Sequence, residues 1–224
     1  MNITKAILTK NPCYIAGKTI KVKGLMLHSI GCPQPSAEKL IKSWNTSDTK
    51  VCVHGFIDGN TGEVYQTLPW THRGWHCGGD ANGTHIGIEM CEPGCIEYIS
   101  GANFTCSNKT KAKAVVERTY KTAVELFAYL CDKYDLNPLA EGVILAHSEG
   151  YKKGLASNHA DPEHLWKGLK LPYTMDGFRK DVKAAMNPII YRVQVGAFSN
   201  EQNAKNLLEK LKKAGFDGFV KKGE

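Results

Sequence analysis

Two short apolar segments, far apart in the sequence, each carry a histidine at or near their C-terminal end. The first is Gly24-Leu25-Met26-Leu27-His28-Ser29-Ile30, and the second is Val143-Ile144-Leu145-Ala146-His147. Continuous apolar runs of this length are typical of buried strands. The sequence therefore predicts two core strands that each bring an imidazole to the end of the strand.

Helical periodicity separates these predicted strands. Residues 107–134 carry one apolar stripe and end at Asn137-Pro138, which predicts a long amphipathic helix. A short helix is predicted after Ser36, a suitable capping residue, and another over residues 175–186.

Three further segments alternate like strands. Residues 51–57 and 63–67 flank the turn-forming run Asp58-Gly59-Asn60-Thr61-Gly62, which predicts a hairpin. Residues 85–91 place Ile86, Ile88 and Met90 on one face, so that Glu89 lies on the other. Strands separated by helices, with a hairpin at one edge, predict an α/β fold with a mixed central β-sheet flanked by helices.

Asn187-Pro188 marks a predicted boundary between a main domain, residues 1–186, and a small unit, residues 187–224. In the small unit, residues 191–195 alternate like a strand. A helix with inward leucines then ends at Gly215, and a short strand is predicted around Phe219-Val220. This βαβ unit has little core for independent stability. We expect it to pack on the main domain, to form a dimer with a second copy, or to belong to a longer sequence.

Composition narrows the functional classes. No apolar run approaches the length of a membrane span, and the N-terminus has no signal-peptide pattern, so we expect cytoplasmic synthesis and no membrane insertion. The net charge of +7 suits an acidic partner such as a cell-wall polymer, but no nucleic-acid recognition motif is present. The eight cysteines are expected to be free thiols, with Cys91 and Cys95 the pair most easily brought together.

Two histidines and an aspartate form a candidate metal site. His28 and His147 lie at predicted strand ends, and Asp161 lies in the loop that follows His147. Catalytic zinc commonly uses three such protein ligands and a water. His159 or Cys77 could equally supply the third ligand, and all these residues could instead be ordinary polar groups at strand ends.

Amide hydrolysis at such a metal also needs a proton carrier and a group that stabilises the oxyanion. Glu89 is the candidate for the first role and His159 for the second, although a solvated glutamate and an exposed loop histidine are the simpler interpretations. His76 and Trp75 could line a substrate cleft. Trp70, Trp75 and Trp166 could offer flat faces to sugar rings or peptide, and each could equally be a core residue.

Six segments, in order, resemble the zinc-dependent N-acetylmuramoyl-L-alanine amidases of phage lysins, recycling amidases and peptidoglycan recognition proteins. They include Leu27-His28-Ser29, Gly74-Trp75-His76-Cys77-Gly78, Ile86-Gly87-Ile88-Glu89, Ala146-His147-Ser148-Glu149 and Ala160-Asp161-Pro162, and the sixth spans residues 53–66. The resemblance implies a mixed sheet with flanking helices. It also implies Zn²⁺ held by His28, His147 and Asp161, with Glu89 as the catalytic glutamate. His159 falls where other members carry lysine or threonine.

The tail resembles half of a SPOR domain, a peptidoglycan-binding module, through Tyr191-Arg192-Val193-Gln194-Val195-Gly196-Ala197-Phe198-Ser199 and the helix that follows. Together the two resemblances imply an enzyme that hydrolyses the amide bond between N-acetylmuramic acid and L-alanine in peptidoglycan. We expect a phage or prophage endolysin, or an autolysin, that reaches the wall through a holin or on lysis. The alternative is a peptidoglycan-binding protein that has lost catalysis.

Overall fold

The computed structural model describes residues 2–186 and 193–222. The chain divides into two compact units, residues 1–187 and 188–224. The predicted boundary at Asn187-Pro188 falls outside the described residues. Each unit is considered by itself.

The larger unit is built on a six-stranded mixed sheet with the strand order β1-β4-β3-β5-β2-β8. Antiparallel pairing is confined to β3 and β4, and the other neighbours in the sheet are parallel. The strands are β1 (Ile3–Lys5), β2 (Gly24–Ser29), β3 (Gly55–Ile57), β4 (Val64–Gln66), β5 (His85–Met90) and β8 (Ile144–Ala146). A separate hairpin is formed by β6 (Ile96–Ser100) and β7 (Asn103–Cys106).

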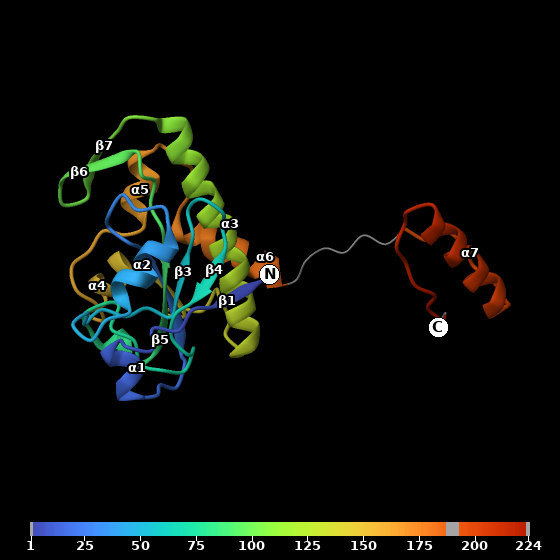
Figure 1. Ribbon diagram of the computed structural model, residues 1–224, viewed down its shortest axis with the longest axis horizontal. Coiled ribbons are helices and arrows are strands. Elements are labelled where there is room, and N and C mark those ends of the chain that lie inside the picture. Colours follow the sequence, from blue (N-terminus) through green and yellow to red (C-terminus); the bar gives the residue numbers. More distant parts are fainter. Residues whose placement is uncertain (1, 187–192, 223–224) are drawn as a thin grey trace. The chain divides into compact units, whose positions relative to one another are not determined.

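Helices cover this sheet on both faces, as predicted (Figure 1). They are α1 (Pro12–Ala16), α2 (Ala37–Trp44), the 3-10 helix η1 (Asp80–Gly83), α3 (Lys109–Lys133), α4 (His147–Lys152), α5 (Glu163–Gly168) and α6 (Met175–Met186). The long predicted helix is confirmed as α3. It begins where the Asn108 side chain accepts a hydrogen bond from the backbone N–H of Lys111, at 2.9 Å.

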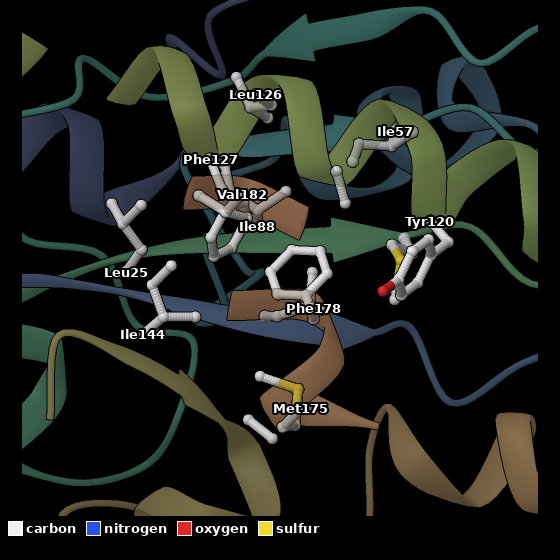
Figure 2. Close-up of a cluster of buried hydrophobic side chains, with 14 of the residues drawn as sticks. Leu25, Ile57, Ile88, Tyr120, Leu126, Phe127, Ile144, Met175, Phe178 and Val182 are labelled. Atoms are coloured by element: carbon white, nitrogen blue, oxygen red, sulfur yellow. The ribbon is translucent and has the colours of Figure 1, made fainter. Parts of the chain in front are cut away.

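The main core lies between the sheet and the helices α3 and α6. Leu25 and Leu27 of β2 and Ile86 and Ile88 of β5 point to this face and are fully buried. Figure 2 shows Phe178 of α6 among these side chains and those of α3. Because side chains alternate along a strand, the residues between these apolar positions point to the opposite face. Met26, His28, Gly87 and Glu89 therefore share the face opposite α3.

The predicted hairpin is confirmed, although β3 is shorter than the alternation suggested and Cys52 makes only an isolated bridge to Trp75. Asp58 closes the turn by accepting hydrogen bonds from the backbone N–H groups of Asn60 and Thr61. The hairpin was predicted at the edge of the sheet, and this position is wrong. The edge strand is β1, which pairs with β4 in parallel.

Two local predictions were wrong in detail. The Ser36 side chain does not cap α2. Asp58 instead accepts the hydrogen bond from Ala37 N at 2.8 Å, because the hairpin turn brings its carboxylate to the helix start. The segment that begins at His147 is not a loop but the helix α4. Its Glu149 carboxylate accepts from the backbone N–H of Ala146 at 2.9 Å.

Cys91 and Cys95, the pair expected to be most easily brought together, are free thiols in different clusters. Cys91 is buried in the cluster around Phe56 on the α2 side of the sheet. Cys95 packs at the edge of the main core, next to Cys106. The short loop between them turns the two side chains into different clusters.

In the smaller unit, residues 193–222 contain the helix α7 (Glu201–Lys213), capped by Asn200 and followed by Gly215 with a positive φ of 88°. The predicted helix is confirmed, but the flanking strands are not formed within these residues. A strand needs a neighbouring strand to satisfy its backbone hydrogen bonds. Residues 191 and 192, which open the first predicted strand, lie outside the described part. Among the described helices, none is long and apolar enough to span a bilayer.

Candidate active site

The candidate ligands meet where three parts of the chain converge on the face of the sheet opposite α3. His28 lies near the end of β2, between β5 and β8. Leu27 pairs with Ala146 in the parallel β2–β8 ladder. The residues that follow them in the chain, His28 and His147, therefore lie side by side. Asp161 completes the set from the turn before α5. Carboxyl ends of parallel strands are the usual place for a ligand site in α/β proteins.

The geometry of these three side chains suits a metal ion. Nδ1 of His28 lies 3.0 Å from Nδ1 of His147 and 3.2 Å from Oδ2 of Asp161, and Nδ1 of His147 lies 3.5 Å from Oδ1 of Asp161. A tetrahedral zinc with bonds of about 2.0–2.1 Å places its ligand atoms about 3.3 Å apart. All three residues are buried, and their donor atoms form a possible metal site.

His28 is oriented by a hydrogen bond between its outer nitrogen and His76. Nε2 of His28 lies 3.0 Å from Nδ1 of His76, and Nε2 of His76 lies 3.1 Å from the carbonyl oxygen of His85. A carbonyl only accepts, so Nε2 of His76 carries its proton and Nδ1 accepts from His28. This order leaves Nδ1 of His28 unprotonated toward His147 and Asp161. Burial also lowers the pKa of His28, which favours the neutral ring that a metal needs.

His147 is oriented in the same way by its outer nitrogen. Its Nε2 lies 3.2 Å from Oγ of Ser157, which donates its own proton to the carbonyl of Cys77 at 3.1 Å. Nδ1 of His159 lies 3.1 Å from the same nitrogen. Either partner accepts the Nε2 proton, so Nδ1 of His147 is also free to bind a metal.

Asp161 is charged in this arrangement. Burial raises the pKa of Asp161, but the adjacent imidazoles of His147 and His28 outweigh this effect and hold the pKa well below its ordinary value. The backbone N–H of Ser29 also donates to Oδ2 at 3.3 Å. Two neutral imidazoles and one carboxylate are a donor set that zinc uses in catalytic sites.

Glu89 lies directly beside His28, because the two residues are paired in the parallel β2–β5 ladder. Its side chain is buried, and Oε2 has no hydrogen-bond partner within the part of the chain that the structure describes. Burial, together with the negative charges of Asp161 and Glu92, raises the pKa of Glu89 well above its ordinary value. A buried carboxyl group with a raised pKa holds a proton more readily than an exposed glutamate does.

A second, partly buried network was not predicted from the sequence. The Tyr98 hydroxyl lies 2.7 Å from Oε2 of Glu92 and 2.7 Å from Nε2 of His164, and Gly31 N donates to Oε1 of Glu92 at 3.0 Å. These contacts link the loop after β2, the β6–β7 hairpin and α5. Glu92 and Tyr98 are separated by residues 93–97, and no sequence motif marks them. The charge of Asp161 contributes to the raised pKa of both Glu92 and Tyr98, so the network lies near the candidate ligands.

The remaining candidates lie in different places. Trp70 and Trp166 are core residues. Trp75 is 42% exposed and lines a pocket formed with the N-terminal segment, and none of the three candidate ligands lines that pocket. His76 is brought to the site but supports His28, and the exposed His159 contacts the outer side of His147. Glu149 pairs with Arg179 of α6 and fixes the start of α4.

Comparison with known proteins agrees with this fold. The Staphylococcus aureus hydrolase AmiA, solved in complex with its ligand, superposes with a TM-score of 0.63 at 17% identity, covering 83% of each chain. A mutant endolysin from Bacillus subtilis gives 0.55 at 21% identity, covering 81% of this chain and 99% of that one. The PlyG catalytic domain gives 0.58 at 17% identity, covering 86% and 100%. The predicted mixed sheet with flanking helices is thus confirmed. A search of curated proteins found no match.

Family models match both units of the chain. The SPOR domain model matches residues 187–224. The model for N-acetylmuramoyl-L-alanine amidase matches residues 18–164, a range that includes His28, Glu89, His147 and Asp161. That range covers more than half of the 224 residues. The chain therefore belongs to the N-acetylmuramoyl-L-alanine amidase family.

Proposed function

We propose that this amidase cleaves the amide bond between N-acetylmuramic acid and L-alanine in peptidoglycan, with zinc held by His28, His147 and Asp161. The observation that carries the proposal is the convergence of three buried donor atoms, all within 4.8 Å of one another, beside the buried Glu89. A peptidoglycan-binding protein without activity would not need this complete set. When bound, zinc supplies a Lewis acid that activates water and polarises the scissile carbonyl.

Glu89 is the proposed proton carrier. Its position beside His28 brings its carboxyl group next to the candidate ligands. In the ionised form it takes a proton from the attacking water, and it then passes that proton to the leaving amide nitrogen. Its raised pKa suits this role, because a carboxylate with a raised pKa is a stronger base than an exposed glutamate.

His159 is proposed to stabilise the oxyanion that develops on the scissile carbonyl. Its exposed ring stands edge-on to His147, with 4.5 Å between the ring centroids. Its contact with Nε2 of His147 also supports a role in orienting that ligand. His159→Ala separates the two roles. Loss of orientation weakens zinc binding, whereas loss of oxyanion stabilisation lowers kcat at full zinc occupancy.

The biological setting follows from the same proposal. An endolysin or autolysin is made in the cytoplasm and acts on the wall after release through a holin or on lysis. The SPOR-type unit, residues 187–224, is proposed to add affinity for peptidoglycan. His76 and Trp75 remain proposed to line the substrate cleft. His76 lies beside the candidate ligand His28, and Trp75 presents an exposed ring.

The test measures zinc content and the new chain ends in digested peptidoglycan. Asp161→Asn should lose bound zinc and activity together. Glu89→Gln should keep zinc but lose activity by about 10²–10⁴-fold. Glu97→Gln, an exposed glutamate on β6, is the matched control and should behave as wild type. Equal activity of wild type and Glu89→Gln would contradict the proposed role, and wall binding without amide cleavage by the zinc-loaded protein would contradict the function.

A further inference from the structure

Two thiols from distant parts of the chain meet beside the N-terminal segment. Cys13 lies in the first turn of α1, and Cys52 lies just before β3. Cys13 packs against the buried cluster of Leu8, Cys52 and Leu68. The sulfur of Cys13 lies 4.0 Å from the carbonyl oxygen of Lys50, two residues before Cys52, so the two side chains lie in the same cluster.

Hydrogen bonds of the surrounding backbone fix the positions of Cys13 and Cys52. The side-chain amide of Asn11 donates to the carbonyls of Thr49 and Val51 at 3.1 and 3.0 Å, and its oxygen accepts from Cys13 N at 2.9 Å. Cys52 N and O are both paired with Trp75, at 3.0 and 2.9 Å. One buried asparagine thus ties the segment of Cys13 to the segment of Cys52.

The two thiols differ in access and in acidity. Cys52 is fully buried, whereas Cys13 is half-buried and lines a pocket of about 180 Å³. The neighbouring thiol of Cys52 and the charge of Arg73 lower the pKa of Cys13, although burial opposes them. The neighbouring thiol of Cys13, together with burial, raises the pKa of Cys52. Cys13 is therefore the thiol that can react first.

The pocket over Cys13 is basic. Besides Cys13 and Trp75, it is lined by Lys18, Lys50 and Arg73. Three cations around one small pocket favour a small ligand with carboxylates, and they stabilise a thiolate at the pocket floor. Arg73 lies over the Trp75 ring, with its guanidinium carbon 5.2 Å from the ring centroid, which keeps the cation at the pocket wall.

We propose that Cys13 and Cys52 form a redox-active dithiol, oxidised to a disulfide by a small anionic disulfide that docks in the basic pocket over Cys13. The thiolate of Cys13 attacks one sulfur of the small disulfide, which breaks its S–S bond and releases one small thiolate. The thiol of Cys52 then gives up its proton and attacks the sulfur of Cys13, which releases the second small thiolate. Two protein thiols are oxidised, the small disulfide is reduced to two thiols, and the two protons end on them.

The disulfide would fasten the N-terminal segment to the strand region that carries Trp75 and His76. It closes a loop of about forty residues and so restricts the unfolded chain. A disulfide of this kind raises Tm by about 5–15 °C in a chain of this size. The amidase acts on the cell wall, outside the reducing cytoplasm, where a disulfide persists.

The test uses the full chain, with oxidised glutathione as the anionic disulfide, hydroxyethyl disulfide as the neutral one and cystamine as the cationic one. Trypsin releases Cys13 in residues 11–18 and Cys52 in residues 51–73, each as the single cysteine of its peptide. We expect these two peptides linked after oxidation, a higher Tm, and oxidation by glutathione at low salt about tenfold faster than by cystamine. No linked peptide, or a faster reaction with cystamine, overturns the proposal.

Variants make the order of events testable. Cys52→Ser should accumulate a mixed disulfide at Cys13, whereas Cys13→Ser should leave Cys52 unmodified. Lys50→Gln should slow the reaction with oxidised glutathione but not with hydroxyethyl disulfide. Cys131→Ser removes a buried thiol of the main core and serves as the control, which should still form the link. A mixed disulfide at Cys52 in Cys13→Ser, or an unchanged rate in Lys50→Gln, would refute the assigned roles.

Discussion

Nδ1 of His76 lies 3.0 Å from Nε2 of His28, and the other nitrogen of His28 faces His147 and Asp161. The His76 ring is itself fixed by the carbonyl of His85, at the start of β5. One ring thus connects the backbone of β5 to a candidate zinc ligand. This arrangement decides which nitrogen of His28 carries the proton, and so decides whether His28 can bind a metal.

His76→Phe should weaken zinc binding without removing a ligand. The variant keeps the ring volume but loses the acceptor for the Nε2 proton of His28, so the ligand tautomer is no longer fixed. Loss of such a partner typically costs about 10–100-fold in metal affinity. Competition with a chelator measures the change, and His76→Gln, which can still accept, should recover part of it. Unchanged affinity in His76→Phe would show that His28 is oriented by other contacts.

Gly87→Ala should have a similar effect from the other side of the ring. A Cβ at position 87 would lie 2.4 Å from Cγ of His76, closer than real contacts allow, so the ring must move. Gly83→Ala is the matched control, because a Cβ there meets no atom of the described chain within 4 Å. We expect weaker zinc binding and a lower Tm for Gly87→Ala alone. Equal zinc affinity and Tm in the two variants would exclude this packing effect.

Much of the fold was predictable because its periodicity is local. The strands that carry His28 and Glu89, the helix α3 and the hairpin at Asp58 all follow from patterns within a few residues. The site was less accessible. The register that places His28 beside Glu89 and His147 is a long-range property, and the positions of His76 and Ser157 depend on hydrogen bonds between loops. The family resemblance supplied what periodicity could not.

Two misassignments have simple physical causes. The sequence predicts a loop at His147 because residues 147–152 are too few to show helical periodicity, yet Glu149 fixes a helix start there through Ala146 N. The strands predicted in the small unit have alternation but no paired neighbour within residues 193–222. Alternation shows that a segment could join a sheet, whereas the sheet itself depends on a partner.

Arg179 should contribute to stability by holding α6 to the start of α4. Its Nε donates to the carbonyl of Ile144 at 3.0 Å, and its guanidinium pairs with the Glu149 carboxylate. Arg179→Met should lower the free energy of unfolding by about 2–3 kcal/mol, because it leaves a partly buried carboxylate without its cation. Lys153→Met breaks an exposed pair and should cost less than about 0.5 kcal/mol.

Urea unfolding measures both changes at equal zinc loading. A double-mutant cycle with Glu149→Gln isolates the pair from the packing of the long Arg179 side chain. A coupling energy near zero, with Arg179→Met no worse than Lys153→Met, would mean that the contact with Glu149 does not stabilise α4.

Glu92 should lower the stability of the folded protein as pH rises. An exposed, ion-paired carboxylate has the opposite effect. Its side chain is fully buried, and burial raises its pKa from 4.5 to about 7, although hydrogen bonds from Tyr98 and Gly31 oppose the shift. The folded protein therefore binds this proton more tightly than the unfolded chain does. The free energy of unfolding should fall as pH rises from about 4.5 to about 7, and should change no further through this group above pH 7.

Glu92→Gln removes this dependence, because the amide still accepts from Gly31 N but cannot ionise. At about 1.4 kcal/mol for each pH unit, the difference between wild type and variant should shift by up to about 3 kcal/mol in favour of the variant between pH 4.5 and 7.5. Urea unfolding at several pH values and equal zinc loading measures the shift. Other titrating groups are shared by both proteins and cancel in the difference. Parallel pH profiles would mean that the folded protein does not hold the proton on Glu92, and that Tyr98 and Gly31 offset the burial of its charge.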